Sequence, residues 1–383
     1  MTTALGRELL PEFERQTGVR VIHKSVQMNQ DDLARIMVGE GPDVLVTWNL
    51  NMLNLLRANL LVELTPYLNR WDGRQSFFPA FLPTGGNASL NPYTLPIEIS
   101  PFGVGYSKGA FTAAGLDPES PPQGWGELEK AVEKLSLRMG GRLIRQGFDT
   151  QWWHPEIVAT FLQLNDEVGI SPDHRVAQLA TERALEAFEF MSRLYQAAYP
   201  IAQAGGVTTP PGGFPMRILD GVTAMSFWSP SMSYEARRRG AAIEIGAFAP
   251  RRSVDSEPKA PAYFKLIGIV HHSNRDPAAA WELIKWLFEP ENTVAYHLYT
   301  QSLPSRHDVV ADLTKAVPYM KDWYRVLNHV NAGAPYGLAG IIQAERELFL
   351  RGLWGRIDLH EAIDRINRRY QEYLDQAWAE AGQ

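Results

Sequence analysis

Between Leu9 and Leu64 the sequence alternates helix-type and strand-type patterns, and this alternation limits the possible folds more than any other feature. A helical spacing of apolar residues ends at Gly18, and the apolar run at 19–22 is typical of a short strand. A second helical pattern precedes the run at 43–46, which is typical of a strand buried in a parallel sheet. Strands that alternate with helices predict an open α/β sheet, in which ligands bind at the carboxyl ends of the strands.

The composition is that of an ordinary globular protein. The chain has 383 residues, of which 45% are hydrophobic and 21% are charged, and this suits a core of two or three domains. The formal net charge of -6 gives no reason to expect a nucleic-acid partner. Because the chain has no cysteine, the sequence excludes disulfides, thiolate zinc sites, cysteine nucleophiles and a lipid-modified cysteine.

Sequence patterns for metal and nucleotide chemistry are missing. His271 and His272 would point to opposite faces of a strand, so they cannot chelate one metal together. The chain has no HExxH motif, calcium-binding loop, P-loop or complete dinucleotide fingerprint. We therefore expect no metal site and no cofactor.

Five stretches of sequence carry a family resemblance, and in chain order they are PEFERQTGVRV with GEGPDVLV and LLVELTPYL, TLPIEISPFGVGYSK with its continuation to VEKLS, GVTAMSFWSP, DPAAAWELIKWLFEPENTVAYHLYTQSLPSRHDV, and HEAIDRINRRYQEYLDQA. Together they cover nearly the whole chain. They resemble, in the same order, segments of the extracellular solute-binding proteins that feed ABC importers. The resemblance is to the larger class, which binds sugars and other organic solutes.

This resemblance implies an α/β fold of the two-lobed, type II periplasmic-binding-protein kind, with a central ligand cleft. The lobes are expected to be built from separated segments, lobe I from 1–108 and 247–307, and lobe II from 109–246 and 308–383. The hinge is expected near Lys108, Ala247 and His307. Helical patterns around 125–139 and 185–194 indicate that lobe II is mostly helical.

The family also implies a location and partners. Its members are extracytoplasmic, in the periplasm or on the outer cell surface, and they deliver a small-molecule ligand to the membrane permease of an ABC importer. We expect a monomer. The sequence departs from the family at its start, where a helical pattern follows Met1 almost directly, without the usual buried strand or export signal. It also carries Tyr263 and Lys265 where many relatives have a glycine pair, so the ligand surface is expected to differ there.

Aromatic and polar residues near strand ends are candidates for binding a sugar. A pyranose offers flat patches of C–H groups to an aromatic ring and a rim of hydroxyls to polar side chains. The candidate ligand-binding residues are Trp48, Asn49, Glu98, Asp149, Trp152, Trp153, Trp228, Gln301 and Tyr336. Each tryptophan could instead pack in a core, Glu98 could form an ion pair, and amides at helix starts could act as caps.

Two alternatives to a sugar-binding protein stay open. The family also binds glycerol phosphates and polyamines, so the ligand could be a non-sugar solute. The segment 105–109 matches the G-x-S-x-G pattern of a nucleophile elbow, which would make Ser107 the nucleophile of an α/β serine hydrolase. No HGGG-like oxyanion segment occurs upstream of it, and short patterns recur by chance. We therefore favour a binding protein without catalytic residues.

Overall fold

The chain divides into two compact units, each made of two separated segments. The structure is a computed structural model. Unit 1 comprises Met1–Ser100 and Ala262–Leu327, and unit 2 comprises Pro101–Pro261 and Asn328–Gln383. The described residues are 9–24, 30–48, 55–56, 58–82, 92–140, 142–149, 155–198, 217–240, 242–272, 275–331 and 337–381.

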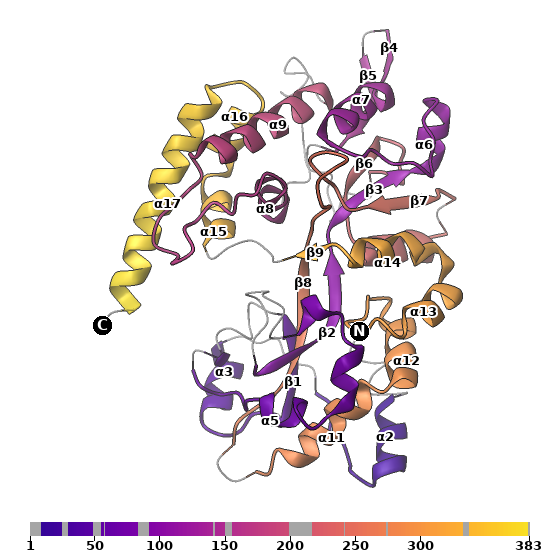
Figure 1. Ribbon diagram of the computed structural model, residues 1–383, viewed down its shortest axis with the longest axis vertical. Coiled ribbons are helices and arrows are strands. Elements are labelled where there is room, and N and C mark those ends of the chain that lie inside the picture. The colour runs from indigo at the N-terminus through magenta and orange to yellow at the C-terminus, as the bar shows by residue number, and fades with distance from the viewer. Residues whose placement is uncertain are drawn as a thin grey trace. The chain divides into compact units, whose positions relative to one another are not determined.

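Unit 1 consists of three strands and of short helices that precede and follow them along the chain (Figure 1). The strands are β1 (Val44–Trp48), β2 (Thr94–Pro101) and β8 (Ala260–Ile269), of which β2 and β8 each continue across a unit boundary. The helices are α2 (Leu10–Thr17), α3 (Gln30–Met37), α5 (Thr65–Leu68), α11 (Ala278–Leu287), α12 (Pro290–Thr300), α13 (Val310–Ala316) and α14 (Lys321–Leu327). Three short 3-10 helices are η2 (Asp72–Ser76), η3 (Pro79–Phe81) and η5 (Pro318–Met320).

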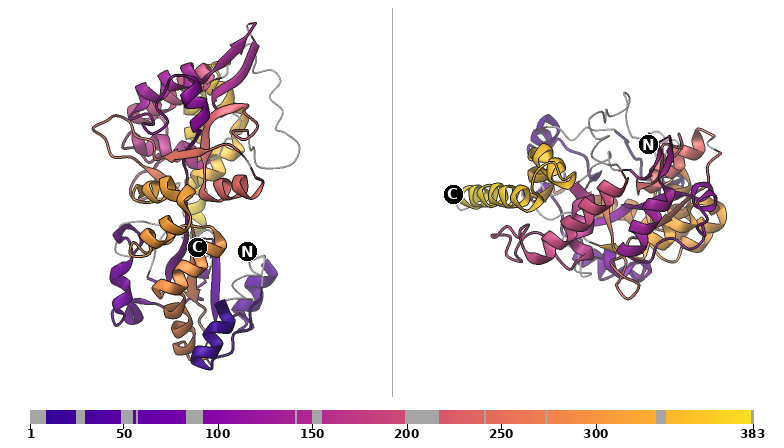
Figure 2. Two further views of the ribbon diagram at one scale, coloured as in Figure 1. Left: turned by 90° about the vertical axis from the view of Figure 1, so that its right-hand side faces the viewer. Right: turned by 90° about the horizontal axis from the view of Figure 1, so that it is seen from above.

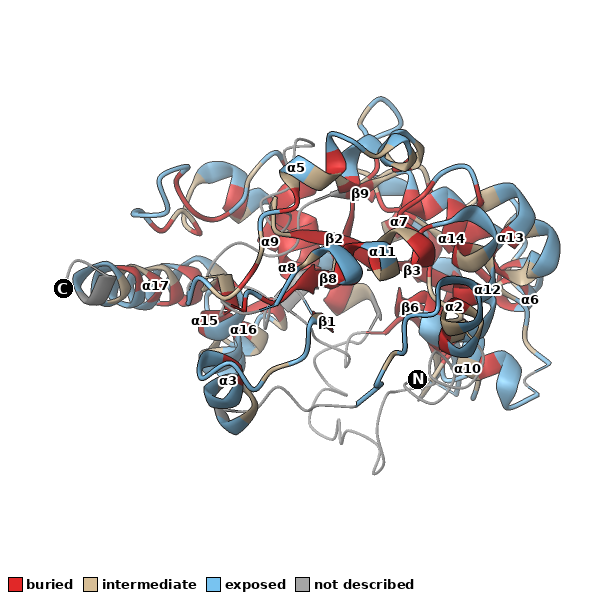
Figure 3. Ribbon diagram, turned by 90° about the horizontal axis from the view of Figure 1, so that it is seen from below, coloured by how far each residue is buried: buried red, intermediate tan, exposed pale blue. Residues whose placement is uncertain are grey.

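The sheet of unit 1 has the strand order β1-β8-β2. β1 pairs with β8 in antiparallel orientation, and Trp48 lies opposite Lys265. Strands β2 and β8 are buried along most of their length (Figure 3). Aromatic residues of α11 fill the core beside this sheet: Trp281 packs against Trp71, and Trp286 packs against Phe13. These two tryptophans are buried, as their helical spacing predicts.

Unit 2 contains a larger sheet and longer helices. Its strands are β3 (Gly103–Ser107), β4 (Leu137–Met139), β5 (Arg142–Phe148), β6 (Thr223–Trp228), β7 (Ile245–Phe248) and β9 (Val330–Asn331). Its helices are α6 (Lys108–Ala113), α7 (Trp125–Leu135), α8 (Pro155–Leu164), α9 (Glu182–Ala198), α10 (Pro230–Arg238), α15 (Leu338–Ala344), α16 (Arg346–Leu353) and α17 (Leu359–Ala381).

The sheet of unit 2 has the order β4-β5-β6-β3-β7, and β9 pairs separately with β8 at Ala260 and Pro261. β5 and β6 are parallel, whereas β3 is antiparallel to both of its neighbours. Beyond its pairing with β6, β5 forms a narrow ribbon with β4 that projects from the unit (Figure 2). Helix α7 lies so close to β5 that a Cβ on Gly147 would be 2.0 Å from the backbone oxygen of Val132. Position 147 therefore has no room for a side chain and requires glycine.

Two expectations about the fold differ from the structure. The run at 19–22 forms no strand, and Val19 and Ile22 are exposed. The sheet of unit 1 is not parallel, because the strand that pairs with β1 comes from far along the chain and runs the opposite way. Unit 2 is rich in helices, as expected, and a five-stranded sheet lies among them.

The boundaries between the units also differ from those expected. The chain leaves unit 1 after Ser100, returns at Ala262 and leaves again after Leu327, rather than near Lys108, Ala247 and His307. The physical reason is strand pairing. β3 and β7 hydrogen-bond within the sheet of unit 2, so the segments that contain Lys108 and Ala247 belong wholly to that unit.

Candidate functional site

Neighbouring strands of unit 1 bring three chemically distinct side chains together. Trp48 ends β1, and its Cα is the cross-strand partner of Lys265 on β8. Directly opposed residues of paired strands place their side chains on the same face of a sheet. The Lys265 Nζ lies 5.0 Å from the centroid of the Trp48 ring, within the range of a cation–π interaction. Glu98 is supplied by β2, on the other side of β8.

The Glu98 carboxylate accepts a hydrogen bond on each oxygen. Lys265 Nζ donates to Oε2 at 2.7 Å, and the hydroxyl of Tyr296 on α12 donates to Oε1 at 2.6 Å. Glu98 and Lys265 are each only 5% exposed, so this is a buried ion pair. Burial, and then the charge of Glu98, raise the pKa of Tyr296 well above its ordinary value, which keeps its hydroxyl proton available for donation.

Trp48 differs from its neighbours because its side chain is 43% exposed. Its ring forms a T-shaped contact with Tyr263, with centroids 6.2 Å apart and an interplanar angle of 73°. Tyr263 and Lys265 are two residues apart on β8 and therefore share a face of the sheet. We call Trp48, Tyr263, Lys265, Glu98 and Tyr296 the Trp48 row. It combines an exposed aromatic ring with charges that are paired beneath the surface.

The helix that supplies Tyr296 also contains a buried histidine. Burial lowers the pKa of His297 from 6.5 to about 3, although a hydrogen bond with the backbone of Ser302 raises it. The Nδ1 atom also lies 2.9 Å from the Ser302 Oγ. The folded protein therefore stabilises the neutral imidazole of His297 relative to its protonated form.

The stability of the protein should consequently depend on the protonation of His297. Because the folded-state pKa is below the unfolded-state value, this contribution is complete above pH 6.5 and is lost as the pH falls toward 3. At pH 5 we expect the loss to be about 2 kcal/mol relative to pH 7.5, from about 1.4 kcal/mol per pH unit. Urea unfolding at both pH values measures it. His297→Gln should remove this part of the pH dependence, and an equal dependence in the variant would contradict the assignment.

Unit 2 contains a second polar cluster, immediately after β5. Asp149 is buried, and its backbone N–H donates to the carbonyl of Met225 at 2.7 Å. Its Oδ2 lies 3.8 Å from Nε of Arg217, whose Nη2 donates to Oε1 of Gln146 at 2.9 Å. The pKa of Tyr195 is raised by burial and then by the charge of Asp149. The predicted Asp149 thus belongs to a buried ion pair in unit 2.

Trp228, by contrast, is a buried residue at the end of β6 in unit 2. Its exposed fraction is 0%, and its Nε1 donates to the Ser233 hydroxyl at 3.0 Å. A Cβ on Gly105 would lie 2.6 Å from the Cβ of Trp228, so the neighbouring strand approaches this side chain closely. These contacts favour core packing for Trp228 over stacking on a solute.

Gln301 is held within unit 1 by local contacts. It ends α12 with a φ of 53°, in the left-handed region that few residues other than glycine adopt. Its amide N–H donates to the carbonyl of Leu298, and its Oε1 accepts from the Tyr319 hydroxyl at 2.5 Å. This geometry indicates a structural role at the helix end. The remaining predicted residues, Asn49, Trp152, Trp153 and Tyr336, lie outside the described residues and stay predictions.

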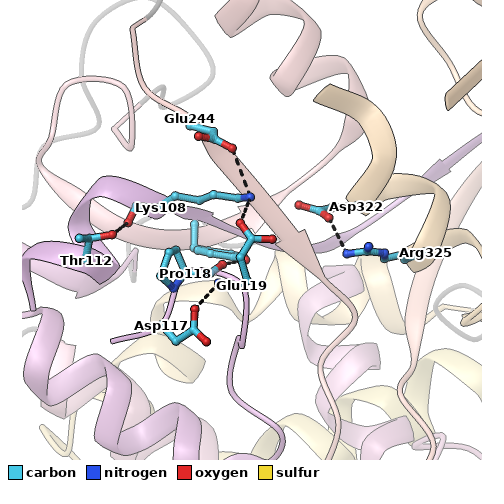
Figure 4. Close-up of polar contacts among 9 residues, drawn as sticks. Lys108, Thr112, Asp117, Pro118, Glu119, Glu244, Asp322 and Arg325 are labelled. Carbon is cyan, nitrogen blue, oxygen red and sulfur yellow. Dashed lines mark hydrogen bonds and ion pairs between the residues drawn. The ribbon is translucent and has the colours of Figure 1, made fainter. Parts of the chain in front are cut away.

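The G-x-S-x-G segment has a structural explanation. Ser107 precedes α6, and its Oγ accepts a hydrogen bond from the N–H of Ala110 at 3.2 Å, which makes it the N-cap of that helix. The next residue, Lys108, is buried and forms ion pairs with Glu119 at 2.5 Å and Glu244 at 3.2 Å (Figure 4). Both residues of the motif therefore fix local structure.

The part of the chain that the structure describes contains neither a membrane-spanning helix nor a metal-binding cluster. None of the helices there is long and apolar enough to span a membrane. Within the same residues, no group of three or more His, Cys, Asp or Glu side chains could hold a metal ion.

Sequence reasoning missed part of the Trp48 row. The sequence marks Tyr263 and Lys265 only as a departure from the family's glycine pair, and nothing in it singles out Tyr296. A lysine within an apolar strand is a usable signal, because a buried ammonium requires a carboxylate partner. The partner, Glu98, also interrupts an apolar strand pattern.

Comparisons with known proteins give one family. The model of the bacterial extracellular solute-binding protein family matches residues 8–323. No curated protein matches the chain.

Several solved structures share its fold. The sugar-binding protein MalE from Xanthomonas citri has a TM-score of 0.82 and 18% identity, covering 99% of this chain and 96% of that one. The cyclic alpha-maltosyl-1,6-maltose binding protein from Arthrobacter globiformis has a TM-score of 0.79 and 17% identity, covering 98% and 96%. UgpB from Mycobacterium tuberculosis, solved with glycerophosphocholine, has a TM-score of 0.73 and 21% identity, again covering 98% and 96%. By fold and by the match to its family model, the chain belongs to the bacterial extracellular solute-binding proteins.

Proposed function

We propose that this protein is the substrate-binding component of an ABC importer and that it captures a carbohydrate or a related polyhydroxylated solute without making or breaking a bond. The observation that carries the proposal is the exposed ring of Trp48 above a buried, paired charge. Among proteins of the same fold, two of the structures named above are sugar-binding by name, which supports this class of solute.

The chemistry of the Trp48 row suits a neutral solute. An exposed indole face can stack on the C–H groups of a pyranose. The ammonium of Lys265 is matched by the carboxylate of Glu98, so these two groups add no net charge that would attract an anion. A phosphate ester would instead be expected to meet an arginine or lysine whose charge was not already balanced. A glycerol phosphate or a polyamine is the alternative solute. The importer partner, a monomeric state and hinge closure over an interlobe cleft remain predictions.

A thermal-shift screen tests the proposal directly. The purified protein would be heated with mono-, di- and trisaccharides, glycerol phosphates, glycerophosphocholine and polyamines, since a solute that binds only the folded state raises the melting temperature. A shift confined to one saccharide class would support the proposal and identify the solute class. A shift with a phosphate ester or polyamine alone would replace the sugar with that solute.

Replacing Trp48 with alanine should weaken binding of the solute identified in the screen by more than about tenfold, or about 1.4 kcal/mol, because the stacking surface is lost. Isothermal titration calorimetry measures the change. Trp378→Ala is a matched control, since Trp378 in unit 2 is similarly exposed, at 41%. Equal affinities for wild type and Trp48→Ala would remove Trp48 from the binding site.

A further inference from the structure

We infer that Lys265 is a positioning residue for Trp48, and that Glu98 and Tyr296 hold Lys265 in place so that the stacking ring is oriented before a solute arrives. The role in binding rests on the proposed function, whereas the positioning can be observed in the free protein. Glu98, expected from the sequence to touch the ligand, thereby acts through Lys265 and Trp48.

The Trp48 ring is restrained on two sides. Exposed side chains usually change rotamer within nanoseconds, and a solute that stacks on such a ring must first immobilise it. Here the Lys265 ammonium lies over the ring at 5.0 Å, and the edge contact with Tyr263 limits its tilt. A ring fixed in this way loses less conformational entropy on binding.

Lysine alone is a poor anchor, because its side chain has four rotatable bonds. In this structure a hydrogen-bonded ion pair restricts the Lys265 side chain. Glu98 accepts from Lys265 Nζ at 2.7 Å, and its second oxygen accepts from the Tyr296 hydroxyl at 2.6 Å. Lys265, Glu98 and Tyr296 come from β8, β2 and α12, so two strands and a helix meet at the Glu98 carboxylate that holds the ammonium group. Both Glu98 oxygens are used within the protein, which favours positioning over direct solute binding.

The competing explanation is a purely structural ion pair that happens to lie near Trp48. The two explanations differ in what Tyr296→Phe does. Tyr296 contacts Glu98, Glu98 holds Lys265, and Lys265 lies over the Trp48 ring. If Lys265 positions the ring, the loss of the Tyr296 hydroxyl is transmitted to Trp48 through these contacts. A structural ion pair would change melting temperature without changing the environment of the Trp48 ring.

The experiment uses the full chain labelled with 5-fluorotryptophan and observed by fluorine NMR. The Trp48→Phe spectrum identifies the Trp48 resonance among those of the 11 tryptophans. The variants are Tyr296→Phe, Lys265→Arg, and the pair Lys265→Met with Glu98→Gln, which removes both charges together. Tyr319→Phe is the matched control, because it also removes a phenol hydroxyl in unit 1.

In the free protein, we expect Tyr296→Phe and the double variant to shift or broaden the Trp48 resonance, and Tyr319→Phe to leave it unchanged. With the saccharide that gives the largest shift in the thermal screen, the double variant should bind about tenfold more weakly, which is about 1.4 kcal/mol. Lys265→Arg should stay within about threefold of wild type, because a guanidinium retains the cation–π contact and the ion pair.

An unchanged Trp48 resonance and unchanged affinity in the folded double variant would overturn the inference. So would a loss of affinity in Tyr296→Phe that leaves the resonance in place. Failure of the proposed function has a different signature. If no saccharide binds the wild type but the Trp48 resonance still responds to Tyr296→Phe, the positioning stands and the sugar-binding function does not.

Discussion

Glu98→Ala is expected to lower the free energy of unfolding by about 3–5 kcal/mol, because it leaves the Lys265 ammonium buried without its carboxylate. Both partners are 5% exposed and 2.7 Å apart. The substitution also removes the acceptor of the buried Tyr296 hydroxyl, which costs more free energy than a hydrogen bond at the surface. Urea unfolding followed by circular dichroism measures the change.

The matched variant is Glu98→Ala combined with Lys265→Met. Removing both charges of a buried pair is often neutral, whereas removing one is strongly destabilising. The double variant should therefore recover much of the stability that Glu98→Ala loses. If both variants were equally unstable, the loss would come from the space vacated by Glu98 rather than from the uncompensated charge.

Trp228→Ala should destabilise unit 2 by about 3–5 kcal/mol, the usual range for truncating a buried large aromatic residue. The fully buried Trp228 packs against the strand that contains Gly105, and truncation also removes the hydrogen bond that its Nε1 donates to the Ser233 hydroxyl. The alanine would leave a cavity in a β-sheet core, which can collapse only partly.

Trp378→Ala, in the same unit, provides the comparison. Trp378 is partly exposed and stacks with Arg175, so its removal should cost about 1 kcal/mol or less. Melting temperature and solute affinity would be measured for both variants. A Trp228→Ala protein with normal stability but no solute binding would contradict core packing and restore the sequence-based assignment of Trp228 to the ligand site.

The contrast between Trp48 and Trp228 shows how far sequence reasoning reaches. Both tryptophans end an apolar strand, and the same rule made both candidates for the ligand surface. The structure separates them, since Trp48 is at the end of a strand that pairs only with β8 within the described residues and is exposed, whereas Trp228 is fully buried. Burial of a strand end depends on elements far away in the sequence, which local periodicity does not report.

The Trp48 row illustrates the same limit for polar residues. Glu98 was a candidate by its place in a strand, but its partners Lys265 and Tyr296 are brought to it by pairing between segments more than 150 residues apart in the chain. The family resemblance predicted the kind of fold and the separated segments. It did not predict the antiparallel pairing of β1 with β8, because helix–strand alternation alone suggests parallel neighbours.

The pairing of β1 with β8 also sets when the sheet of unit 1 can form during synthesis. Residues 44–48 cannot form their strand pairing until residues 265–269 have been synthesised. A ribosome adds those residues roughly 10 to 45 s later, at about 5–20 residues per second. During that interval β1 has no hydrogen-bonding partner from its own sheet among the described strands, and its apolar residues are available to other chains. The sheet of unit 1 therefore cannot form before residue 269 has been made, whereas every strand of the five-stranded sheet of unit 2 precedes that point.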